Sequence, residues 1–120
     1  MLVGTEWIVD AEGCDAAALK DPEKLQMILQ QVISDLRLHV LSTPMLHKFP
    51  EPGGVTGLIM LTESHLACHT YPEFRAATFN LYCCKHRPEW QWEAQLSKAL
   101  GATRVTVRKV QRGAASERSE

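Results

Sequence analysis

The 120-residue sequence lacks a long hydrophobic run and an excess of charge of either sign. With 13 Lys and Arg against 14 Asp and Glu, no basic charge draws the protein toward nucleic acid or an anionic membrane surface. No apolar stretch reaches the roughly eighteen residues of a membrane span, and the first residues lack the basic and apolar regions of a signal peptide. We therefore expect a soluble, cytoplasmic protein that binds a small molecule and neither nucleic acid nor membrane.

The sequence also lacks the spaced cysteine pairs of a disulfide framework. Two of its four cysteines, Cys83 and Cys84, are adjacent, and adjacent cysteines do not readily bridge each other. We expect free thiols. The length suits one compact domain, residues 1–113, followed by a polar tail, residues 114–120, which we expect to be disordered.

Hydrophobic periodicity predicts the order of the elements. Asp21-Pro22 supplies an N-cap and a first-turn proline to one helix, and Gly101 a C-cap to another. An apolar run without alternation, residues 55–62, predicts a strand buried on both faces. The expected elements are strands at 2–9, 55–62, 76–84 and 104–110, helices at 22–39 and 88–101, an extended stretch at 40–49, and turns at 10–13 and 50–54.

This order predicts an α+β fold, a two-layer sandwich of a mainly antiparallel sheet with two helices on one face. The other face of the sheet would carry apolar residues into solvent. We therefore expect the protein to pair as a homodimer through or beside that face. Alternation along 76–84 predicts that Cys83 faces the core and that Cys84 lies on the more polar side.

Reactive side chains concentrate between residues 63 and 86 and allow three interpretations. The first is a zinc site, because histidines and cysteines supply nitrogen and sulfur ligands. The spacing argues against it, since there is no C-x2-C pair and Cys83 and Cys84 point to opposite faces; we expect no metal. The donors are His65, Cys68, His69, Cys83, Cys84 and His86.

The second interpretation is a cysteine–histidine nucleophile pair. Such pairs arise often by chance, and the sequence shows neither an oxyanion-hole motif nor an oriented third member. Taken one at a time, these side chains are explained as well by buried thiols and hydrogen-bonded histidines in a sheet.

The third interpretation depends on the whole string of motifs. In order, they are Gly54-Val55-Thr56-Gly57, Glu63-Ser64-His65, His69-Thr70-Tyr71-Pro72-Glu73, Ala76-Ala77 and Cys84. With these motifs the sequence resembles the bacterial S-adenosylmethionine decarboxylase proenzymes. The resemblance extends more loosely over most of the chain, and a pattern with fixed gaps over some thirty residues is more specific than any triplet within it.

The resemblance implies self-cleavage between Glu63 and Ser64, giving a β chain of residues 1–63 and an α chain of residues 64–120. Ser64 would become a covalent pyruvoyl group, the only cofactor. In the family's pattern His69 takes the proton removed during elimination, Thr56 hydrogen-bonds the cyclic intermediate, and Cys84 returns a proton to the substrate. The extra methyl of Thr56, where serine is usual, is expected to slow processing.

The same resemblance predicts which residues bind the substrate. Phe49 and Tyr71 match positions that stack on adenine, and Glu73 matches the carboxylate that binds the ribose hydroxyls. The implied reaction is decarboxylation of S-adenosylmethionine to the aminopropyl donor of spermidine synthesis.

Some positions depart from the family pattern. Tyr71 replaces the usual tryptophan, Asn80 replaces the usual aspartate, and Cys83-Cys84-Lys85 occupies the positions where Thr-Cys-Gly is typical. Because these residues surround the substrate pocket, decarboxylation of a free amino acid such as arginine or ornithine is the first alternative. A non-processing metal-binding or structural homologue is the second.

Overall fold

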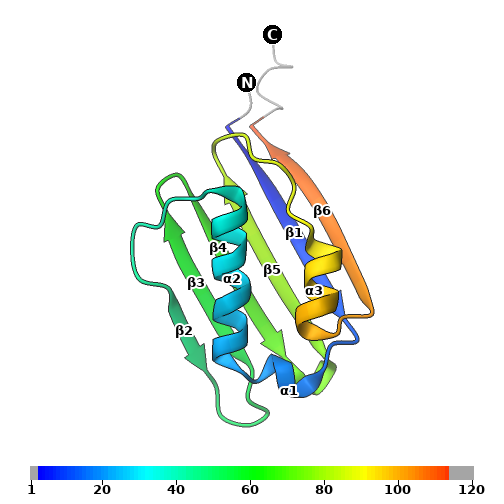
Figure 1. Cartoon of the computed structure of the whole chain (residues 1–120). Helices are drawn as coiled ribbons and strands as arrows, with labels where there is room; N and C mark the ends of the chain where they lie inside the picture. The colour runs from blue at the N-terminus through cyan, green and yellow to red at the C-terminus, as the bar shows by residue number, and fades with distance from the viewer. Residues whose placement is uncertain (1–2, 114–120) are drawn as a thin grey trace.

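The computed structural model describes residues 3–113 and shows one six-stranded sheet with its helices on one side (Figure 1). The strand order is β2-β3-β4-β5-β1-β6, and each neighbouring pair is antiparallel. The predicted α+β sandwich is confirmed. The elements are β1 (Gly4–Glu12), α1 (Ala16–Leu19), α2 (Pro22–Leu36), β2 (Met45–Lys48), β3 (Val55–Leu61), β4 (Ser64–Tyr71), the 3-10 turn η1 (Pro72–Phe74), β5 (Ala76–Cys83), α3 (Trp92–Leu100) and β6 (Arg104–Arg112).

The caps set the ends of α2. Asp21 accepts a hydrogen bond from the Glu23 N–H at 3.0 Å, which satisfies a free donor of the first turn. The helix ends at Leu36 because Arg37 is left-handed, with φ of 56°, so the predicted extension to residue 39 is wrong. The short helix α1 was not predicted, since four residues are too few to show a helical period.

The second long helix, α3, begins four residues later than predicted. Residues 88–91 are not helical, and the Trp90 side chain instead packs into the core, edge-on to Trp92 with ring centroids 4.9 Å apart. At the other end Gly101 takes φ of 71° as the C-cap, as predicted.

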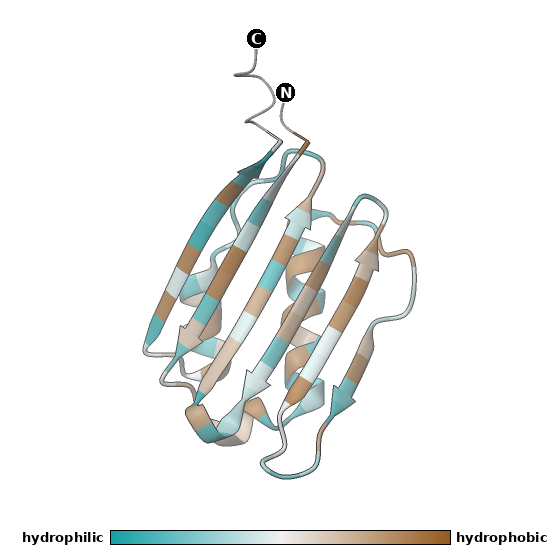
Figure 2. Cartoon of the chain, turned by 180° about the vertical axis from the view of Figure 1, so that it is seen from behind, coloured by the Kyte–Doolittle hydropathy of each residue, from teal (hydrophilic) through white to brown (hydrophobic). Residues whose placement is uncertain are grey.

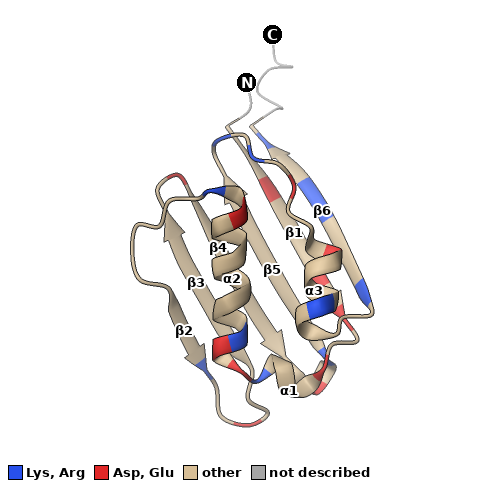
Figure 3. Ribbon diagram, viewed as in Figure 1, with Lys and Arg blue, Asp and Glu red and all other residues tan. Residues whose placement is uncertain are grey.

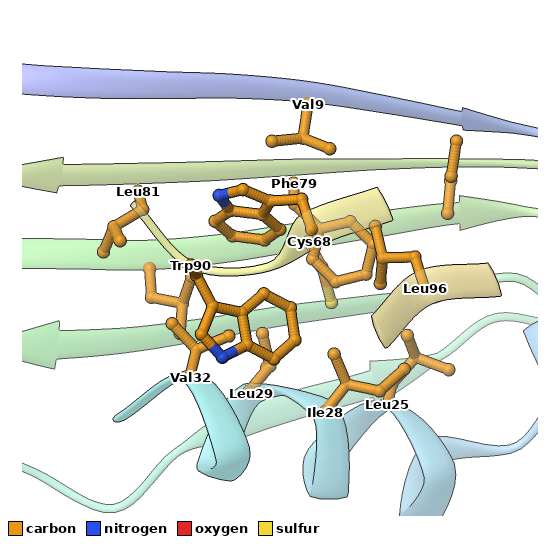
Figure 4. Packing of buried hydrophobic residues seen from close by; sticks show 14 of the residues in the cluster. Val9, Leu25, Ile28, Leu29, Val32, Cys68, Phe79, Leu81, Trp90 and Leu96 are labelled. Atoms are coloured by element: carbon orange, nitrogen blue, oxygen red, sulfur yellow. The ribbon is translucent and has the colours of Figure 1, made fainter. Parts of the chain in front are cut away.

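The core lies between the sheet and the helix layer (Figure 4). Side chains at alternate positions of the central strands point toward α2 and α3 and interleave with the apolar stripes of both helices. The residues labelled in the figure are Val9, Leu25, Ile28, Leu29, Val32, Cys68, Phe79, Leu81, Trp90 and Leu96.

The other face of the sheet, the open face, carries no helix (Figure 2). On β3, Ile59 points to the helices, whereas Leu58 and Met60 are 47% and 58% exposed. The prediction that this strand is buried on both faces is therefore wrong for the single chain. An apolar run identifies a strand whose two faces are both apolar. It does not show whether the layer that covers the second face comes from the same chain.

Three strand boundaries also differ from the prediction. β1 continues through Asp10 to Glu12 instead of turning there, because these residues pair with β5 on one side and β6 on the other. Of the extended stretch 40–49 only Met45–Lys48 is a strand. β6 runs to Arg112, and the tail at 114–120 lies outside the described residues. Among the helices described, none is long and apolar enough to cross a membrane.

Candidate functional site

The predicted cleavage position lies at a tight turn. Thr62 and Glu63 connect β3 to β4, and Ser64 is the first residue of β4, paired with Leu61 on one side and Cys83 on the other. The backbone N–H of Cys84 donates a hydrogen bond of 3.1 Å to the carbonyl oxygen of Glu63. That carbonyl belongs to the Glu63–Ser64 peptide bond, so the hydrogen bond polarises the group that Ser64 would attack.

The surroundings of Ser64 are partly buried. Its side chain hydrogen-bonds to Cys83, and Lys85 Nζ lies 3.3 Å from Glu63 Oε1. Burial raises the pKa of the Cys83 thiol, more than the Ser64 hydrogen bond and the charge of Arg87 lower it. Cys83 is buried and Cys84 exposed, which confirms their predicted orientations.

A second group of predicted residues lies at the opposite end of β4. His69 Nδ1 and Thr56 Oγ1 are 3.0 Å apart, because Thr56 and His69 are register partners on the open face. Phe49, Tyr71 and Glu73 line the same cavity, whose volume is about 400 Å³. The structure therefore joins the predicted substrate-binding residues to the Thr56–His69 pair.

The two groups do not meet within one chain. Ser64 and His69 are five positions apart on β4 (64 to 69), a separation of about 17 Å along a strand. Their side chains also leave opposite faces, since alternate strand residues do. The cavity beside Ser64 measures about 10 Å³, room for one water at most. The predicted site residues thus form two separate groups in the chain, which we call the Ser64 half-site (Glu63, Ser64, Cys84) and the His69 half-site (Phe49, Thr56, His69, Tyr71, Glu73).

The geometry gives no support to a zinc site. Cys68 points into the core and is fully buried, whereas its sequence neighbours His65 and His69 are exposed on the open face. Burial raises the pKa of Cys68 to about 12, so at neutral pH it is a thiol and not the thiolate that zinc requires. Within residues 3–113 no three potential metal ligands are grouped closely enough to hold an ion.

Sequence reasoning missed a polar network on the open face. Asn80 Oδ1 lies 3.0 Å from His65 Nε2, and Asn80 Nδ2 donates to Glu6 at 2.7 Å. Arg112 donates to the other Glu6 oxygen, also at 2.7 Å. The hydrogen bond from Asn80, with that of Arg112, holds the pKa of Glu6 below its usual value despite partial burial. The sequence signal for this network was the substitution at Asn80, since the other members, Glu6, His65 and Arg112, lie on three other strands.

Comparison with known proteins gives one consistent result. A family model described as S-adenosylmethionine decarboxylase matches residues 5–113. Two relatives are named S-adenosylmethionine decarboxylase proenzyme. The protein of Pelotomaculum thermopropionicum is 33% identical over 113 residues, covering 92% of this chain and 87% of its own. That of Thermoplasma volcanium is 34% identical over 113 residues, covering 92% and 85%.

A solved structure agrees with these relatives. The adenosylmethionine decarboxylase of Aquifex aeolicus VF5 superposes with a TM-score of 0.78 at 26% identity, covering 93% of this chain and 92% of that one. The resemblance predicted from the motifs is confirmed over nearly the whole chain. The chain belongs to the S-adenosylmethionine decarboxylase family.

Proposed function

We propose that this chain is a proenzyme that cuts itself between Glu63 and Ser64 and then decarboxylates S-adenosylmethionine, for spermidine synthesis. The observation that carries the proposal is the hydrogen bond from the Cys84 N–H to the Glu63 carbonyl, in a tight turn directly before a serine. The family names support the substrate.

The cleavage uses groups of this protein and water, with no added cofactor. Ser64 Oγ attacks the Glu63 carbonyl carbon while the Cys84 N–H stabilises the charge that develops on its oxygen. The C–N bond breaks and an ester forms. Loss of the Ser64 Cα proton then breaks the ester C–O bond, Glu63 leaves as a carboxylate, and residue 64 remains as a dehydroalanine. Its imine tautomer takes up water and releases ammonia, which leaves a pyruvoyl group at the new chain end. Because β3 and β4 stay paired in the sheet, chains 1–63 and 64–120 remain one folded unit.

The residues of the Ser64 half-site fit a pyruvoyl group formed from Ser64. The pyruvoyl group would supply the electron sink on which the substrate loses its carboxylate. Cys84, exposed beside the new chain end, donates the proton that the substrate α-carbon then requires.

The His69 half-site fits the rest of the substrate. Phe49 and Tyr71 are 47% and 40% exposed around an open cavity, so both aromatic faces are free to stack on adenine and to lie near the sulfonium charge. Glu73, in the same cavity, accepts hydrogen bonds from the ribose hydroxyls. The Thr56 hydroxyl orients His69 through its contact with Nδ1, which leaves Nε2 to carry the proton removed from Ser64.

The separation of the half-sites supports a two-protomer site. A proton does not pass directly between groups about 17 Å apart, so the His69 half-site has to come from a second copy. In a two-fold dimer one such contact implies its symmetric twin. A dimer that pairs Ser64 of each protomer with His69 of the other therefore holds two complete sites.

The substrate is tested by measuring CO2 release from purified, processed protein. We expect release from S-adenosylmethionine and none from arginine, ornithine or other free amino acids. Processed protein that releases CO2 only from a free amino acid would refute the substrate and leave the self-cleavage intact.

The two-protomer site is tested by co-expression of Ser64→Ala and His69→Ala chains carrying different tags. In the mixed dimer, Ser64 of the His69→Ala chain faces the intact His69 of its partner. We therefore expect the His69→Ala chain to be cut in the mixture and to stay largely uncut alone, while the Ser64→Ala chain stays whole. A His69→Ala chain that remains equally uncut in the mixed dimer would show that the site lies within one chain.

A further inference from the structure

A second cavity, of about 280 Å³, adjoins Cys84 on the side away from the His69 half-site. It lies where the loop after β5 meets the start of β1 and the end of β6. Figure 3 shows basic residues on this loop and along β6. We call it the basic cavity, and its lining includes Trp7, Cys84, Lys85, His86, Arg87 and Lys109.

The charged side chains that line the basic cavity are all positive among the described residues. They are Lys85, Arg87 and Lys109, and none of the described residues that line the cavity is a carboxylate. Lys85 has a partner in Glu63. Lys109 lies over the Trp7 ring, 6.0 Å from its centroid. The sequence offered only part of this signal, in Lys85 where the family pattern has glycine.

Two buried donors in the lining also lack acceptors. The indole Nε1 of Trp7, a residue that is 2% exposed, and the Nε of Arg87 make no hydrogen bond with any described residue. A buried N–H without an acceptor is costly. Positive charge in the lining, with donors that lack acceptors on two of the lining residues, fits a ligand that is negative and offers only acceptor oxygens.

The reacting carboxylate of the substrate is the wrong anion for this cavity. Cations that held it would stabilise the ground state, whose charge is lost from that group as CO2 leaves, and would therefore slow the reaction. The cavity volume of about 280 Å³ has room for a compact ion. We propose that the basic cavity binds a small polyvalent oxyanion, of which inorganic phosphate is an example, as a non-reacting ligand beside Cys84.

The test is calorimetric titration of the full chain with inorganic phosphate, repeated by phosphorus NMR. We expect one saturable site per chain. Lys109→Gln and Arg87→Gln should each weaken binding roughly tenfold or more, because each removes a charged donor. Trp7→Phe removes the Nε1 donor together with part of the aromatic ring system, and should weaken binding roughly three- to tenfold.

The matched control is Lys98→Gln, which removes an exposed lysine from α3 and should leave the affinity unchanged. Circular dichroism checks that each variant is folded. Three outcomes would overturn the proposal: no saturable binding, equal loss in Lys98→Gln and Lys109→Gln, or wild-type affinity in Lys109→Gln. Displacement of phosphate by S-adenosylmethionine would show that the cavity is part of the substrate site and would overturn it as well.

Discussion

Burial of a thiol links Cys68 to the pH dependence of stability. The side chain is fully buried in the core, and its pKa is raised from 9.0 to about 12. The unfolded chain therefore loses this proton at a lower pH than the folded chain. The contribution of the protonated Cys68 thiol to the free energy of unfolding is complete below pH 9. It declines as pH rises from 9 toward 12, by about 1.4 kcal/mol per pH unit for one such group.

We predict that the free energy of unfolding of Cys68→Ala falls less steeply above pH 9 than that of the wild type. Urea unfolding at pH 7, 9 and 10.5 measures the slope. Buried Cys14 and Cys83 also have raised pKa values, so some slope should remain. The control is Cys84→Ala, an exposed thiol. Identical slopes in Cys68→Ala and the wild type would contradict the prediction.

Thr56 gives a second prediction at this scale. Its β-branched side chain has few rotamers, and its hydroxyl already contacts His69 at 3.0 Å. Replacement by serine keeps the hydroxyl and removes the methyl, so we expect Thr56→Ser to speed self-cleavage by roughly two- to tenfold. A time course of freshly translated chain on a denaturing gel measures it. Slower cleavage than wild type would show that the methyl group helps to place the hydroxyl.

Among the elements, α2 ends on a strained residue. Arg37 adopts φ of 56° as the C-cap, a conformation that costs a side-chain-bearing residue about 1 kcal/mol and glycine little. We expect Arg37→Gly to raise the midpoint of thermal unfolding by a few degrees. Arg37→Ala removes the same side chain but keeps the strain, so it should not. A gain of equal size in both variants would assign the effect to the arginine side chain.

The elements also show what the sequence could and could not predict. Local signals were enough for the start of α2, which Asp21-Pro22 fixes, and for β5, whose alternation distinguishes the buried Cys83 from the exposed Cys84. Local sequence does not show which distant segments pair in the sheet. β1 runs through Asp10 because β5 and β6 flank it, and four residues of α1 carry no period.

For the candidate site, too, the sequence predicted the residues but not their arrangement in space. The motif names candidate residues in both half-sites but leaves open whether one protomer or two complete a site. The opposite facing of Ser64 and His69 could have been inferred from their odd spacing on a strand. The approach of Phe49 to His69 could not, because it depends on how the β2–β3 connection folds over the end of β4.

For the whole molecule, the exposed residues of the open face point to a partner. Leu58 and Met60 are about half exposed in the single chain, as expected of a surface that a second copy covers. We predict that Leu58→Glu shifts the protein from dimer to monomer in light scattering and slows self-cleavage. The control is Met27→Glu, on the helix side and 68% exposed, which should stay dimeric. A Leu58→Glu protein that remains a fully processed dimer would place the interface elsewhere.

The most direct test of the central claim is the intact mass of the purified chain under denaturing conditions. We expect two species, residues 1–63 ending in an ordinary Glu63 carboxylate, and residues 64–120 lighter by one ammonia than a chain that starts with serine. Ser64→Ala should give a single uncut mass. A wild-type protein found only at full length would contradict the account.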